Sequence, residues 1–166
     1  MLTTPATSFY EVVLAVHIMA VVVAFGVTFA YPIMFAVGAR HDPRSLPLLH
    51  RVEYTVERLL VNPGLLLVIL AGVYLASKGH YWSDFFVQWG LGAAIVIGGL
   101  VGSVMIPTAK RAEQAAVRDV AAATGDGEVQ LSDEYRALVR RLSTVGASLS
   151  LLVLVTILFM ALHVGA

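Results

Sequence analysis

Long apolar stretches, nearly free of charge, alternate with charged connections along the chain. Four stretches stand out, at about residues 10–39, 59–77, 85–109 and 142–164. A helix needs about 20 residues to cross the hydrocarbon core of a bilayer, and each stretch is at least about that long. None shows the alternation of apolar and polar positions that is typical of barrel strands. Because a backbone in lipid must pair its own polar groups, the pattern predicts four transmembrane helices.

The connections show helical periodicity of their own. Between the first two stretches, apolar residues recur at helical spacing among charged ones, at Leu49, Val52, Val56 and Leu59. We expect a short amphipathic helix over residues 46–60 that lies along the membrane interface and stops at Asn62. The third helix is expected to run on as a polar helix through residues 110–123, until residues 124–127 break it. Ser132 is predicted to begin the fourth helix.

Composition and charge agree with a membrane protein. Hydrophobic residues make up 58% of the 166-residue chain and charged residues only 13%, against about 25% charged in soluble domains. The formal net charge is zero, so we expect a lipid bilayer and no nucleic acid as the partner. The chain has no cysteine, which excludes thiolate metal sites and covalently attached haem. Residues 1–166 are predicted to form a single membrane domain.

The distribution of positive charge predicts an orientation. All of the 11 Lys and Arg residues except Lys78 lie in the connections at residues 40–58 and 110–141. The positive-inside rule places both connections in the cytoplasm. The chain is thus predicted to be an all-α, four-helix transmembrane bundle with up-down-up-down topology. Both termini would lie outside the cell, and the protein would be a multi-pass protein of the cell membrane.

One titratable side chain, His17, lies deep in the first apolar stretch. It belongs to a row of small and polar residues spaced by seven, Tyr10, His17, Ala24, Tyr31 and Gly38. Seven residues return almost to the same face of a helix, so we expect this row to face the bundle interior. Ionisable groups inside a membrane usually mark function. Three interpretations stay open: a hydrogen-bonded structural histidine, a metal or haem ligand, and a proton relay.

Other residues are weaker candidates for a site. His163 is expected near the outer end of the fourth helix, on the same side as His17, where it could be a second ligand. His41 and His50 are predicted to be surface residues on the inner side. The third helix carries small residues at every fourth position, at Gly90, Ala94, Gly98 and Gly102. This ribbon favours close packing, against another helix of the chain, a second copy, a membrane partner or a flat cofactor.

The first stretch is similar to the opening helix of the CopD-like group of four-helix membrane proteins. The resemblance rests on His17 followed by Phe25-Gly26, Phe29, Tyr31 and Pro32, and on Asn62-Pro63-Gly64 with Gly72. That group includes the copper-resistance protein CopD, the HemJ-type protoporphyrinogen oxidases and an uncharacterised family of integral membrane proteins. The resemblance to the HemJ branch implies that His17 serves a b-type haem. It does not extend to oxidase activity, because Ile33 stands where that branch has a basic residue.

Three functional hypotheses follow, and none of them fixes a particular reaction. The first is a membrane protein that binds haem b or another tetrapyrrole through His17 as axial ligand. In it, Ala20 and Ala24 leave room beside the ligand, Tyr31 offers a hydrogen bond and Gly98 lies near the flat group. The second is a non-catalytic membrane subunit or scaffold that packs through the glycine-rich helix. The third is passage of copper or protons along the row from His17 to Tyr31.

Overall fold

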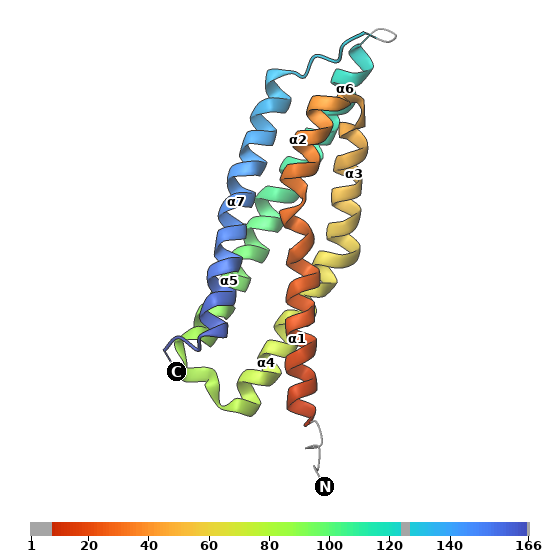
Figure 1. Ribbon diagram of the computed structural model, residues 1–166. Coiled ribbons are helices and arrows are strands. Elements are labelled where there is room, and N and C mark those ends of the chain that lie inside the picture. The colour runs from red at the N-terminus through yellow and green to blue at the C-terminus, as the bar shows by residue number, and fades with distance from the viewer. Residues whose placement is uncertain (1–7, 124–126, 166) are drawn as a thin grey trace.

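The computed structural model describes residues 8–123 and 127–165, and within these ranges it contains helices and no strand (Figure 1). The described residues form four long helices, each apolar and long enough to cross a membrane: Phe9–His41, Pro43–Gly79, Phe85–Ala122 and Asp133–Ala161. They run up, down, up and down in one bundle (Figure 1). The all-α, four-helix prediction is confirmed.

Each of the first three long helices consists of two α-helical segments joined by an irregular turn. In the first, the 3₁₀ turn η1 (Val27–Phe29) joins α1 (Phe9–Gly26) and α2 (Tyr31–His41). In the second, the π turn η3 (Glu57–Val61) joins α3 (Leu46–Val56), which follows η2 (Pro43–Ser45), and α4 (Asn62–Gly79). The short turn η4 (Tyr81–Ser83) leads into the third, where the π turn η5 (Val101–Met105) joins α5 (Phe85–Leu100) and α6 (Ile106–Ala122). The fourth long helix is the single segment α7 (Asp133–Ala161).

Prolines explain where these irregular turns occur. Pro32, Pro63 and Pro107 each follow one of them by a few residues. Proline has no N–H group, and its ring clashes with the carbonyl four residues earlier, so the preceding turn loses its regular hydrogen bond. The helix adapts by a 3₁₀ or π turn and continues. The fourth long helix has no proline, and α7 runs for 29 residues without interruption.

The predicted separate helix over residues 46–60 does not exist as such. The helix does not end at Asn62. Val61 keeps helical dihedral angles (φ −67°, ψ −50°), and α3 continues through η3 into α4. The π turn accommodates the proline that was expected to begin a new helix. As a result α3 packs against α2 and α6 as part of the bundle. Its amphipathic pattern reflects this helix packing.

The bundle has two different halves. We call the end with the α2–α3 connection the Asp42 end, and the end with the α4–α5 connection the Tyr81 end. In the half toward the Asp42 end, α2, α3, α6 and the start of α7 share a core made of Leu46, Ala112, Ala115, Ala116 and Tyr135. In the other half α1 packs on α4, and α5 packs on α7. Helices α1 and α7 begin and end, respectively, at the Tyr81 end (Figure 1).

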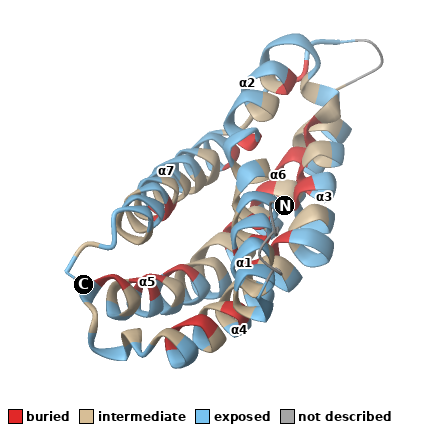
Figure 2. Ribbon diagram, turned by 60° about the horizontal axis from the view of Figure 1, so that its bottom comes forward, coloured by how far each residue is buried: buried red, intermediate tan, exposed pale blue. Residues whose placement is uncertain are grey.

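Burial separates the inner and outer faces of the helices (Figure 2). Buried residues lie where helices face one another, and the outward faces are mostly exposed. Many of the exposed side chains are large and apolar, among them Ile18, Ile33, Leu59, Leu67, Ile95 and Leu151. Extensive exposed apolar surface marks a membrane-facing protein. With four spanning helices, the chain is a multi-pass membrane protein.

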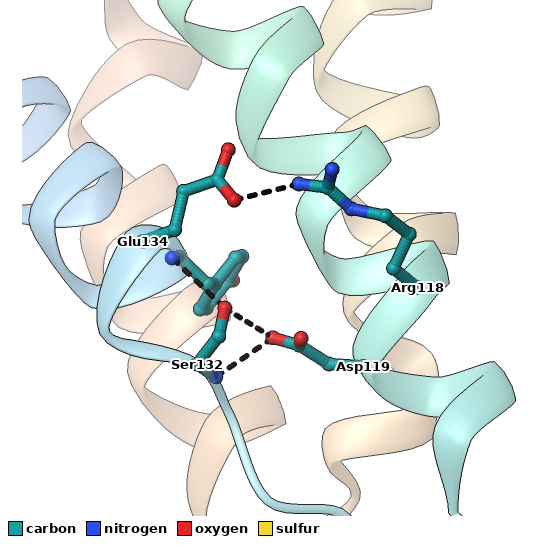
Figure 3. Close-up of polar contacts among 5 residues, drawn as sticks. Arg118, Asp119, Ser132 and Glu134 are labelled. Atoms are coloured by element: carbon teal, nitrogen blue, oxygen red, sulfur yellow. Dashed lines mark hydrogen bonds and ion pairs between the residues drawn. The ribbon is translucent and has the colours of Figure 1, made fainter.

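Polar contacts join α6 and α7 near the Asp42 end (Figure 3). Arg118 donates to Glu134 over 2.8 Å. The backbone N–H and hydroxyl of Ser132 both donate to Asp119 Oδ2, at 2.8 and 2.9 Å. The Ser132 hydroxyl also accepts from the backbone N–H of Tyr135, which confirms the predicted helix start. Of the predicted break at residues 124–127, the first three residues lie outside the described ranges.

Candidate cofactor cavity

A cavity of about 520 Å³ lies between the α1–α4 pair and the α5–α7 pair, toward the Tyr81 end. Its walls are mainly aliphatic, with side chains such as Leu14, Val21, Ile69, Val87 and Ile157. Polar groups are few and lie at His17, His163, Tyr10, Tyr81 and Trp82. Apolar walls with a few polar groups, and a volume of roughly 300–1,000 Å³, are typical of ligand and cofactor sites.

His17 is held in one orientation at the wall of this cavity. The residue is only 9% exposed, so the prediction that it faces the bundle interior is confirmed. Its Nδ1 lies 3.0 Å from the carbonyl oxygen of Val68 on α4. A carbonyl only accepts, so Nδ1 carries the proton and donates, and Nε2 of the neutral ring keeps a free lone pair. Within the described ranges no group hydrogen-bonds this Nε2.

Gly72 makes the close approach of the His17 ring to α4 possible. A Cβ atom at this position would lie 3.2 Å from Cε1 and 3.6 Å from Nδ1 of the ring. One turn earlier, Val68 supplies the carbonyl that the ring binds. The glycine and the carbonyl together therefore fix the ring against the backbone of α4. Gly90 of α5 likewise allows a close approach, because it lies against the methyl group of Met160 on α7.

The second predicted ligand, His163, lines the same cavity as His17. It lies just after α7 with left-handed backbone geometry (φ 49°). Its ring meets the edge of Phe86 on α5, with centroids 5.3 Å apart. Among the residues that the structure describes, neither ring nitrogen of His163 has a hydrogen-bond partner. The structure therefore places two imidazoles with available nitrogens at one apolar cavity.

The other predicted site residues lie elsewhere. Ala20 and Ala24 are buried but do not line the cavity, and Ala24 instead packs against Gly64 of α4. Tyr31 is two heptads from His17, about 21 Å along the helix, and cannot hydrogen-bond to it. Gly98 is exposed, with no atom within 4 Å of where its Cβ would be.

The helical repeat explains the position of Gly98. Four residues turn a helix by about 400°, so each step along the ribbon rotates the side chain by about 40°. Gly90 and Ala94 therefore line the cavity, while Gly98 and Gly102 face away from it into open space. Residues spaced by four therefore share one helix face over two positions, but not over the whole length of the ribbon.

The prediction of a surface position for His50 is wrong. The residue is 3% exposed, and its ring lies 4.5 Å from the ring of Phe35, centroid to centroid. It is enclosed because α3 joins the bundle core and does not lie on an interface. The signal was present in the sequence. His50 is four residues from the buried Leu46 and three from Glu53, so all three share one helix face.

The donor groups of the chain suit a macrocycle better than a bare metal ion. Within residues 8–123 and 127–165, no group of three or more His, Cys, Asp or Glu side chains is placed to hold a metal. Met19 on the first helix, whose sulfur is of a type that binds copper, is 57% exposed. A haem needs only one or two axial ligands from the protein. His17, alone or with His163, is sufficient for that.

Comparisons with known proteins do not place the chain in a family. No protein-family model, no curated protein and no solved structure matches it. The resemblance to CopD-like proteins therefore rests on the residues quoted above.

Proposed function

We propose that this membrane protein binds a b-type haem, or a related flat tetrapyrrole, in the cavity between its two helix pairs. His17 would be an axial ligand through Nε2. The observation that carries the proposal is the hydrogen bond from His17 Nδ1 to the Val68 carbonyl. Metal-ligating histidines commonly donate their other ring N–H to a carbonyl or carboxylate, which fixes the tautomer and the ring orientation.

The residues of the cavity would each contribute to binding. Val68 and Gly72 hold the imidazole in place. The aliphatic walls would keep water from the flat group, and His163 could supply a second axial nitrogen. Tyr10 and Tyr81 lie toward the end of the bundle, where the carboxylates of a porphyrin could reach water. When bound, a haem supplies one-electron redox chemistry.

The orientation in the membrane is part of this proposal. The Asp42 end carries the connections rich in Lys and Arg, so the positive-inside rule favours a cytoplasmic position for it. The cavity and both termini would then lie toward the outer face of the membrane. Accessibility of single cysteines at Ser83 and Gln130 to an impermeant thiol reagent, in intact cells, measures this orientation. Labelling of Q130C and not of S83C would show the opposite orientation.

The absorption spectrum of the detergent-purified protein tests the cofactor. We expect a Soret band in protein purified from cells or loaded with haem. H17A should lose the band because the proposed axial ligand on α1 is gone. Its thermal unfolding should stay cooperative. The matched control is H41A, since His41 is exposed at the opposite end of the bundle. A full Soret band in H17A, or none in haem-loaded wild type, would reject the proposal.

Two alternatives predict different results in the same preparation. A colourless protein whose self-association or partner binding changes in G98L would favour a non-catalytic membrane subunit, since Gly98 faces open space. Copper in elemental analysis, without a porphyrin spectrum, would favour copper passage.

A further inference from the structure

A second set of buried polar side chains lies in the half of the bundle toward the Asp42 end. It consists of Tyr31 on α2, His50 and Glu53 on α3, and Tyr135 on α7, each at most 8% exposed. Around them the core is made of leucine, alanine and phenylalanine side chains. Burying polar groups among such residues is unfavourable unless each is hydrogen-bonded. Their arrangement therefore calls for an explanation beyond packing.

Three of these side chains form a continuous chain of hydrogen bonds. His50 Nδ1 lies 3.3 Å from Glu53 Oε2, and His50 Nε2 lies 3.4 Å from the hydroxyl of Tyr135. With Glu53 ionised, His50 donates its Nδ1 proton to the carboxylate, and the Tyr135 hydroxyl donates to Nε2. The donors then all point in one direction, from Tyr135 toward Glu53.

The charge of Glu53 is not balanced by a fixed cation. In the part of the chain that the structure describes, its ion-pair partner is His50, and no Lys or Arg contacts it. Burying a carboxylate without a fixed cation is costly, and a proton taken up from a neighbour removes the charge. Glu53 is thus suited to accept a proton.

Further titratable groups lie in the same half of the bundle as the chain. The Tyr31 hydroxyl is buried and, among described residues, has no hydrogen-bond partner. Burial is the main influence on this hydroxyl, and the charges of Glu57 and Glu53 are weaker ones. For Tyr135, burial is likewise the main influence, followed by the charge of Glu53 and then that of Asp119 on α6. Asp119 is only half-buried and holds Ser132 at the start of α7 (Figure 3). The hydrogen-bonded chain itself runs from Tyr135 through His50 to Glu53.

We propose that Tyr135, His50 and Glu53 form a proton-transfer chain that takes up a proton at the Asp42 end and holds it on Glu53. A proton from water binds the Tyr135 oxygen as the hydroxyl proton of Tyr135 moves to His50 Nε2. The Nδ1 proton of His50 moves to Glu53 Oε2 in the same sequence. Tyr135 and His50 end neutral, with His50 in its other tautomer, and Glu53 becomes a carboxylic acid.

Infrared difference spectra of the full-length protein, recorded after a drop in pH, test the acceptor. We expect a carbonyl stretching band of a protonated, buried carboxyl group that shifts in D₂O and is missing in E53Q. The control is E134Q, because Glu134 lies on the surface in an exposed ion pair. A band that persists in E53Q, or a Glu53 that stays ionised in mildly acidic solution, would overturn the proposal.

The rate at which the band appears after a rapid pH drop tests the chain. Removing one positioned proton carrier should slow protonation of Glu53 about tenfold or more in H50Q and in Y135F. Y135F keeps the ring and the packing of Tyr135, and cooperative thermal unfolding identifies variants that are folded. Unchanged rates in folded Y135F and H50Q would show that the proton reaches Glu53 by another route and would refute the chain. These experiments do not require a cofactor, so their outcome is independent of the tetrapyrrole proposal.

Discussion

At the scale of single residues, the site depends on which nitrogen of one imidazole is free. The heptad row predicted that His17 faces inward, and its burial confirms this. The hydrogen bond to the Val68 carbonyl could not be predicted, because it depends on the rotation of α4 against α1. Tyr31 shows the limit of the same row. Its face is correctly predicted, but the row does not say that Tyr31 lies in the other half of the bundle.

Gly72 provides a test of the ring position. A methyl group in G72A would lie 3.2 Å from His17 Cε1, and the ring is fixed by its hydrogen bond and cannot withdraw. We expect haem affinity to fall about tenfold, as for other changes beside a metal-ligating histidine. The fold should persist, because alanine is favoured over glycine within a helix by about 1 kcal/mol. Haem titration of the apoprotein measures the effect.

The control for G72A is G99A, since a Cβ on Gly99 would meet no atom within 4 Å. Haem affinity as high as that of the wild type, in both G72A and the bulkier G72V, would contradict the role assigned to the ring position.

His163 provides a test of the second axial ligand. In H163A haem should still bind through His17, but its spectrum should change if His163 supplies a second nitrogen ligand in the wild type. Electron paramagnetic resonance and the visible spectrum measure this change. An unchanged spectrum in H163A would show that His163 does not bind the iron. The comparison variant is H80A, which removes a histidine from the connection next to the cavity without removing a cavity-lining side chain.

At the scale of elements, the sequence predicted the four long helices well but missed the continuity of the second. The apolar stretches are long and uniform, so the existence of four spanning helices is evident from composition alone. Residues 46–60 have an amphipathic pattern, which suits an interfacial helix as well as a helix packed against α6. The structure shows the second arrangement, with α3 packed against α6. The π turn before Pro63 allows the second long helix to continue where the sequence suggested an end, whereas the third was predicted to continue and does so through the π turn before Pro107.

The core between α3, α6 and α7 should tolerate no added volume. Ala115 is fully buried in it, so A115L should destabilise the protein by about 1–3 kcal/mol. The matched control is A122L at the exposed end of α6, where the change should be close to neutral. Thermal unfolding in detergent measures both. An A115L protein as stable as wild type would show that the α6 contact is looser than described.

At the scale of the whole molecule, the chain divides its polar chemistry between two halves of one bundle. The class of the fold followed from the sequence, whereas the cavity did not. Periodicity gives the inward face of each helix but not the separation of the α1–α4 pair from the α5–α7 pair. His163 could be assigned to the same side as His17 by counting residues, but only the packing of the helices brings both to one cavity. His50 became a candidate only once α3 was seen inside the bundle.

The separation of the two helix pairs has a consequence for how a ligand would enter the cavity. Ile18, Val22, Val73 and Leu91 line the cavity and are also exposed on the outer surface. In a bilayer, exposed apolar side chains of this kind would meet acyl chains. A hydrophobic molecule that entered the cavity from there would not cross water, and its occupancy would follow its concentration in the lipid phase.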